Sequence, residues 1–164
     1  MAAPITYSIS DQQYVAVVAG WGGLGILLGD IAARAPGIVN RSRLLVFELD
    51  ATGSLPEPKP FSRGTPEPPP LADDPELIQR GSDLYHTSCF ACHGEGAISS
   101  SSQMPDLRYM SAQKHKLFLP ITLDGILHSR GMAAYSTWVS EEEAKAIHAY
   151  VIREAHDLLE TMTE

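Results

Sequence analysis

The sequence is poor in cysteine, with two in 164 residues, and basic residues are outnumbered, with 12 Lys and Arg against 20 Asp and Glu. A structural zinc site needs a second pair of ligands at matching spacing, and the chain has none. The formal net charge of −8 argues against nucleic acid as a partner. The hydrophobic fraction of 44% supports a packed core, and the length fits one domain, or one domain with an extra segment.

The first residues do not match the pattern of an export signal, and no uninterrupted apolar run of spanning length is found in the sequence. The first residues, MAAPIT, offer no basic region and no apolar stretch of signal length. Residues 12–29 carry no charge, but five glycines interrupt them, so no membrane span is predicted. If the protein is exported, the signal has been removed or lies upstream in a longer chain.

Both cysteines fall in one short motif, CFACH at residues 89–93. This is the attachment pattern of c-type haem, in which Cys89 and Cys92 form thioethers and His93 supplies an imidazole to the iron. A redox disulfide would use the same two cysteines but would leave His93 unexplained. We therefore predict covalent haem. Because such haem is attached on the oxidising side of a bacterial membrane, we expect a periplasmic location.

Proline divides the chain into three parts. Eight of the twelve prolines lie between Pro56 and Pro75, a density that excludes helix and central strand and favours a semi-rigid extended linker. We predict a first part over residues 1–55, a linker over 56–70 and a domain over 71–164.

Two helices are predicted in the last part. Asp74 is a suitable N-cap and Pro75 suits the first helical position, so a helix begins there and runs into the haem motif. Ser140 and Glu143 form a capping box for a final helix that extends to about Leu159.

This arrangement resembles a small class I cytochrome c over about 90 residues, and a mainly α fold is expected. In that family the first and last helices cross at a small residue and aromatic side chains. Gly81 and Tyr85 match the first helix, and Tyr150 matches the last. Gly81 would otherwise weaken its helix by about 1 kcal/mol relative to Ala, so a close approach of two backbones explains it.

The second iron ligand is predicted to be Met132. It lies 39 residues after His93, beside Gly131, in a loop before the last helix, and in small cytochromes c the methionine ligand has this place. Met104 and Met110 follow the motif too closely for a chain that must pass around the haem, and His128 is the alternative ligand. A thioether stabilises ferrous iron and raises the potential. The other histidines are predicted at the surface or its boundary: His86, His115, His148 and His156.

Two further residues are expected near the haem. In cytochromes c a proline about a dozen residues after the motif histidine offers its carbonyl to the other ring nitrogen, and Pro105 follows His93 by twelve. Such a bond fixes the tautomer and raises the basicity of the ligand. Arg108 could neutralise a haem propionate, although an exposed arginine without that role is the open alternative.

The first part presents two patterns. Residues 14–19 and 44–49 are predicted strands, and GWGGLG at Gly20–Gly25 fits the G-x-G-x-x-G pattern of a dinucleotide-binding βαβ unit. The helix after the motif would be barely ten residues long, and about 50 residues cannot complete a parallel sheet. A dinucleotide site is therefore the disfavoured interpretation.

QQYVAVVAGWGG and NRSRLLVFELDATGSLP instead resemble the last propeller strands of quinohaemoprotein alcohol dehydrogenases, in which a class I cytochrome c domain follows a Pro-rich linker. The phrases PDLR and GM-x-x-aromatic occur in that family as well. The resemblance implies a β-hairpin remnant of a propeller blade before the cytochrome domain. It also places pyrroloquinoline quinone (PQQ), calcium and the catalytic residues upstream, so this chain is not expected to oxidise alcohol alone.

The expected function is electron transfer by one haem c, from a PQQ dehydrogenase propeller to a quinone or a small redox protein. The negative net charge favours acceptors with a basic docking face. Two alternatives stay open at this point: a haem gas sensor or peroxidase with an open iron position, and a nucleotide-dependent oxidoreductase.

Overall fold

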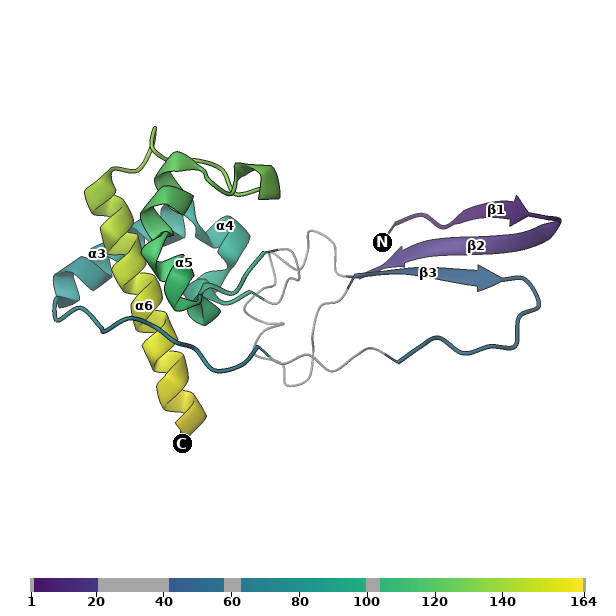
Figure 1. Ribbon diagram of the computed structural model, residues 1–164, viewed down its shortest axis with the longest axis horizontal. Coiled ribbons are helices and arrows are strands. Elements are labelled where there is room, and N and C mark those ends of the chain that lie inside the picture. The colour runs from purple at the N-terminus through teal and green to yellow at the C-terminus, as the bar shows by residue number, and fades with distance from the viewer. Residues whose placement is uncertain (1, 21–41, 58–62, 100–103, 164) are drawn as a thin grey trace.

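A computed structural model describes residues 2–20, 42–57, 63–99 and 104–163. A small β-sheet lies at one end of the molecule and a group of helices at the other (Figure 1). The helical part confirms the predicted mainly α cytochrome c fold, and the sheet precedes it in the chain, as predicted. The division of the chain at residues 55 and 70 stays a prediction.

The sheet is an antiparallel meander of β1 (Ile5–Ile9), β2 (Gln12–Ala19) and β3 (Arg43–Glu48), in that order. Ser10 and Asp11 join β1 to β2 with φ values of 51° and 65°, the positive angles of a tight hairpin turn. The sequence predicts two strands, and the structure adds β1, whose apolar residues alternate with Thr and Ser.

Pairing within the sheet excludes the dinucleotide-binding interpretation. A βαβ unit requires parallel neighbouring strands, whereas β2 pairs antiparallel with β3. Most of the GWGGLG segment itself lies outside the described residues.

Both faces of the sheet carry uncovered apolar side chains. Ile5 and Val46 flank Ala16 on one face, and Val15 pairs with Phe47 on the other. Among the described strand residues Ala16 alone is buried, while Ile5 is 63% exposed. A sheet with apolar residues on both faces is suited to a position between two other layers of protein.

The helical part is built on the crossing of α3 (Pro75–Ser88) and α6 (Glu141–Thr163). The Asp74 carboxylate accepts from the Leu77 amide at 3.0 Å and caps α3, as predicted. Ser140 and Glu143 cap α6 by reciprocal bonds of 2.9 and 3.2 Å, and this helix runs four residues past its predicted end. Shorter elements lie between the two: α4 (Phe90–His93), η1 (Glu95–Ala97), η2 (Leu107–Tyr109), α5 (Ala112–Lys116), η3 (Pro120–Asp124) and η4 (His128–Arg130).

The two long helices approach most closely at Gly81. A Cβ atom there would collide with the backbone carbonyl of Ala146 on α6, which confirms the predicted reason for glycine. The rings of Tyr85 and Tyr150 meet beside it with centroids 5.1 Å apart. Tyr85 is fully buried in the core, and its hydroxyl donates to the Gly94 carbonyl at 2.7 Å.

Residues 63–70 form neither helix nor strand, as predicted, but they lie against the helical part. Arg63 forms an ion pair with Asp106, and Pro66 is buried. The carbonyl of Pro69 lies 2.8 Å from Nε2 of His156 on α6. The second half of the linker is thus a docked strap. In the parts of the chain that the structure describes, no helix has the length and apolar character needed to cross a membrane.

His115 departs from its predicted place at the surface or its boundary, whereas the half-buried His148 agrees with that prediction. His115 is 5% exposed, and its Nδ1 lies 2.9 Å from Nε2 of His148, whose ring stacks on Phe118 with centroids 4.3 Å apart. Burial lowers the pKa of His115, while burial and the neighbouring His115 lower the pKa of His148 to about 4. The pair is therefore neutral at neutral pH.

Candidate haem site

The CFACH motif occupies the end of α3 and the single turn α4. Cys89 caps α3 through a backbone bond from its amide to the Tyr85 carbonyl at 2.8 Å. Its own carbonyl accepts from the amide of His93 at 3.0 Å. This turn brings both sulfurs and the imidazole together, with Cys89 half-buried, Cys92 exposed and His93 only 7% exposed.

The two cysteines are free thiols, as haem attachment requires. Burial raises the pKa of Cys89 to about 12, with a smaller contribution from Cys92. Thiols that exchange disulfides have a depressed pKa in an electropositive setting. The environment of Cys89 is the reverse, which argues against a thioredoxin-like function.

The His93 imidazole is held by the carbonyl of Pro105, which lies 3.0 Å from Nδ1. This is the contact predicted from the twelve-residue spacing. Because a carbonyl can only accept, the proton belongs on Nδ1, and Nε2 is left as the ligating atom. Burial lowers the pKa of His93, so that the imidazole is neutral at neutral pH, as an iron ligand must be.

The residue after Pro105 anchors this segment. Asp106 is buried, and Arg108 donates to its carboxylate through Nε at 3.0 Å and Nη2 at 2.8 Å. Arg63 donates to the same carboxylate from the strap. Arg108 is predicted to bind a haem propionate. In the structure its Nε and Nη2 atoms donate hydrogen bonds to Asp106. A propionate contact through its remaining donors stays a prediction.

Sequence reasoning missed the two other members of this cluster, Asp106 and Arg63. Asp106 precedes a short 3₁₀ turn and caps it, a signal that the PDLR phrase contains. Arg63 has no local signal, because it contacts Asp106 from 43 residues away.

Met132 lies in the loop after η4, where Gly131 has a φ of 93° and permits the turn. Its side chain is half-buried, whereas Met110 is packed in the core and His128 is exposed. Nearby Tyr135 is half-buried, and burial raises its pKa. Tyr135, three residues after Met132, and Cys89 of the motif both pack against the same hydrophobic core.

The donor set fits haem c. Two free thiols and a neutral buried imidazole with its Nδ1 satisfied match the requirements of thioether attachment and of one axial ligand. Phe90 within the motif and Trp138 stay 42% and 75% exposed. Trp138 packs edge-on against Tyr135, with centroids 6.0 Å apart, so apolar surface is available beside the loop that carries Met132.

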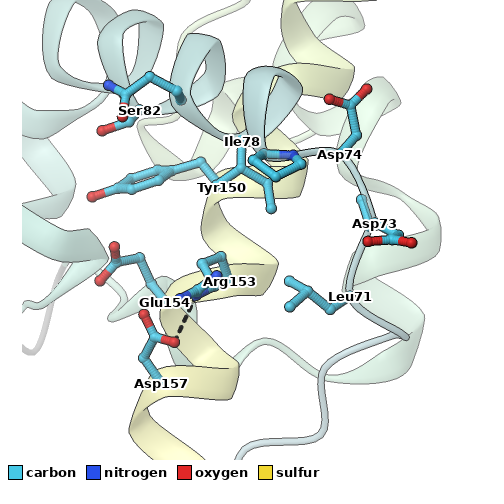
Figure 2. A pocket seen from close by; sticks show the side chains of 12 residues that line it. Leu71, Asp73, Asp74, Ile78, Ser82, Tyr150, Arg153, Glu154 and Asp157 are labelled. Carbon is cyan, nitrogen blue, oxygen red and sulfur yellow. Dashed lines mark hydrogen bonds and ion pairs between the residues drawn. The ribbon is translucent and has the colours of Figure 1, made fainter.

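A pocket in Figure 2 lies elsewhere, between the entry to α3 and the outer side of α6. Asp73, Asp74, Glu154 and Asp157 line it, and Arg153 pairs with Asp157 at 2.7 Å. Among the described residues, none of those predicted to hold haem lines this pocket. Burial raises the pKa of Glu154.

Comparison with known proteins places these observations in a family. Residues 76–151 match the sequence family described as cytochrome C oxidase, cbb3-type, subunit III. The chain is 41% identical over 161 residues to the quinohemoprotein alcohol dehydrogenase ADH IIB of Pseudomonas putida. It is 35% identical over 160 residues to the dehydrogenase subunit of the quinone-dependent alcohol dehydrogenase of Acetobacter aceti. The matches cover 97% and 96% of this chain but 23% and 21% of those relatives.

The fold agrees with solved structures of the same group. The structure of ADHIIG from Pseudomonas putida HK5 superposes with a TM-score of 0.80 at 38% identity, over 98% of this chain and 23% of that chain. The enzyme from Comamonas testosteroni gives a TM-score of 0.61 at 26% identity, over 94% and 22%. The chain thus spans less than a quarter of the length of these proteins. Residues 76–151 form a cytochrome c domain of the kind found at the C-terminal end of quinohaemoprotein alcohol dehydrogenases.

Proposed function

We propose that this chain transfers single electrons through one covalently bound haem c, with His93 and Met132 as the axial ligands. The observation that carries the proposal is the arrangement at α4. Two free thiols lie on one turn with a buried, neutral imidazole, and Nδ1 of that imidazole is hydrogen-bonded to the Pro105 carbonyl. When bound, the haem supplies a one-electron iron couple.

The residues of the chain define the surroundings of that couple. Cys89 and Cys92 would fix the haem edge, and the Pro105 carbonyl orients the imidazole and increases its basicity. Met132 would bind the iron on the side of the haem opposite His93 and favour the ferrous state. With both axial positions filled, oxygen and peroxide have no open coordination position, which distinguishes this function from a gas sensor or a peroxidase.

The electron donor we propose is the reduced quinone cofactor of a PQQ dehydrogenase propeller, and the acceptor is a quinone or a small redox protein. Two observations support this donor: the likeness of the chain to quinohemoprotein alcohol dehydrogenases, and the sheet that leaves apolar residues uncovered on both faces. PQQ and calcium would belong to that propeller. We propose a periplasmic location because thioether attachment takes place on the oxidising side of the membrane.

Acid–acetone extraction tests covalent attachment. After expression with an export signal and a haem-attachment system, the haem should stay with the precipitated protein. A variant with Cys89→Ala and Cys92→Ala is the matched control and should release its colour. A colourless wild-type pellet would contradict the proposal.

A second measurement tests whether this chain oxidises alcohol by itself. Purified haem-loaded protein mixed with primary alcohols, PQQ, calcium and a redox dye should not reduce the dye. It should accept electrons when a PQQ dehydrogenase propeller is added. Dye reduction by the chain without the propeller would show that it is an enzyme in its own right.

A further inference from the structure

Arg63 connects the linker to the segment that holds the proximal histidine. It donates to the Asp106 carboxylate and to the backbone carbonyl of Ser99. Its guanidinium also lies 5.5 Å from the centroid of the Tyr109 ring. One side chain from the strap therefore contacts three places on the segment that follows the haem motif.

These contacts bear on Pro105 through covalent neighbours. The Pro105 carbonyl that binds His93 belongs to the peptide group shared with Asp106, so the position of Asp106 sets the direction of that carbonyl. Asp106 has a side chain only 3% exposed, and this limits its freedom further. On the other side of Pro105, the Ser99 hydroxyl donates to the Met104 carbonyl at 2.7 Å. This bond ties Met104, the residue before Pro105, to Ser99.

Arg108 cannot replace Arg63 in this role. Arg108 and Asp106 are two residues apart, so their ion pair moves with the segment and fixes only its local shape. Arg63 comes from a distant part of the chain, and the burial of Pro66 together with the contact between Pro69 and His156 holds that part against the helices. Arg63 thus adds a polar contact from a distant part of the chain to a segment that also packs on the core through Leu107 and Met110.

We propose that Arg63 is a positioning residue through which the docked linker holds the Pro105 carbonyl on Nδ1 of His93. The linker then does more than separate two parts of the chain, because its docking adjusts the basicity of the iron ligand. A partner that pulls the linker away would loosen this hydrogen bond. The inference rests on the proposed haem function.

The test is solvent exchange of the His93 Nδ1 proton, measured by NMR in the ferrous, diamagnetic, full-length protein with ¹⁵N-labelled histidine. Arg63→Gln should accelerate this exchange about tenfold, since a hydrogen bond to a charged group contributes on the order of 1.5 kcal/mol. Arg43→Gln is the matched control. Arg43 also donates to a linker carbonyl, that of Pro56 at 2.8 Å, but from the sheet, and its loss should leave the exchange rate unchanged.

Arg63→Lys keeps the charge and loses the planar fork that reaches both acceptors. It should accelerate the exchange severalfold, and it provides the answer if Arg63→Gln does not fold. An unchanged rate in the Arg63 variants would overturn the inference, and so would equal acceleration by Arg43→Gln. A wild-type protein without low-spin covalent haem would instead overturn the proposed function.

Discussion

The sheet and the helical part of this chain differ in what covers their apolar residues. In the helical part Tyr85, Ile147 and Val151 are almost completely buried. In the sheet Leu44 and Ile5 are 66% and 63% exposed. The first arrangement supplies its own core, whereas the second leaves apolar side chains exposed on both faces. We propose from this difference that the helices fold autonomously and that the sheet packs against further protein.

Glycine substitutions test this contrast most strongly. Gly81→Ala should destabilise the haem-loaded protein by about 3 kcal/mol, because the new Cβ meets the Ala146 carbonyl of a packed helix. Helix propensity alone predicts the opposite, a gain of about 1 kcal/mol. Urea unfolding followed by circular dichroism measures the change.

Gly53→Ala is the control for that experiment, because the added Cβ would meet nothing within 4 Å. Its effect should stay within about 0.5 kcal/mol. A stabilised Gly81→Ala protein would show that the helices do not cross as closely as the structure places them.

Acid should lower the free energy of unfolding of the helical part through the His115–His148 pair. The strands contain no histidine and should not show this effect. The pKa of His148 is about 4 in the folded protein and 6.5 ordinarily, so the unfolded chain binds the proton first as pH falls. Stability is therefore complete above pH 6.5 and decreases as pH falls from 6.5 to about 4. Urea midpoints at pH 7.5 and pH 5 measure this loss.

His148→Phe keeps an aromatic ring against Phe118 and removes the titrating group. The variant should lose less of its stability between the two pH values than the wild type loses. Equal losses in the two proteins would assign the acid sensitivity to other groups.

Truncation should have the smallest effect on the haem domain. A chain that begins at Arg63 keeps the strap, both long helices and the predicted ligands, so its visible spectrum and urea midpoint should match those of the full chain. It should also self-associate less, because the uncovered sheet has been removed. Sedimentation and absorption spectroscopy provide the two measurements. A shifted spectrum would mean that the first part contributes to the haem fold.

Local signals predicted much of this structure, and contacts between distant residues were missed. Asp74, Ser140 and Glu143 mark helix ends within a few residues of their partners, so sequence alone identified both long helices. The twelve-residue spacing was sufficient to predict the hydrogen bond between His93 and the Pro105 carbonyl, because the haem motif and the family resemblance indicated where such a carbonyl should lie. Arg63 could not be assigned, because its acceptors lie far away in the sequence.

Burial was harder to predict than secondary structure. His115 follows a polar stretch with lysines on either side, yet it is buried against His148, which comes from another helix. The strand Ile5–Ile9 alternates apolar and hydroxyl residues but is too short to stand out, and only its pairing with β2 establishes it. Both errors concern residues whose environment is made by another part of the chain.

The ferric absorption spectrum of full-length protein variants tests the central claim most directly, namely that both axial positions of the iron are filled and that Met132 fills the second. The wild type should be low-spin and show the weak far-red band of an iron–thioether bond. Met132→Ala should abolish that band and lower the reduction potential, and Met104→Ala should leave both unchanged. A high-spin wild-type spectrum, or loss of the band in Met104→Ala instead, would contradict the account.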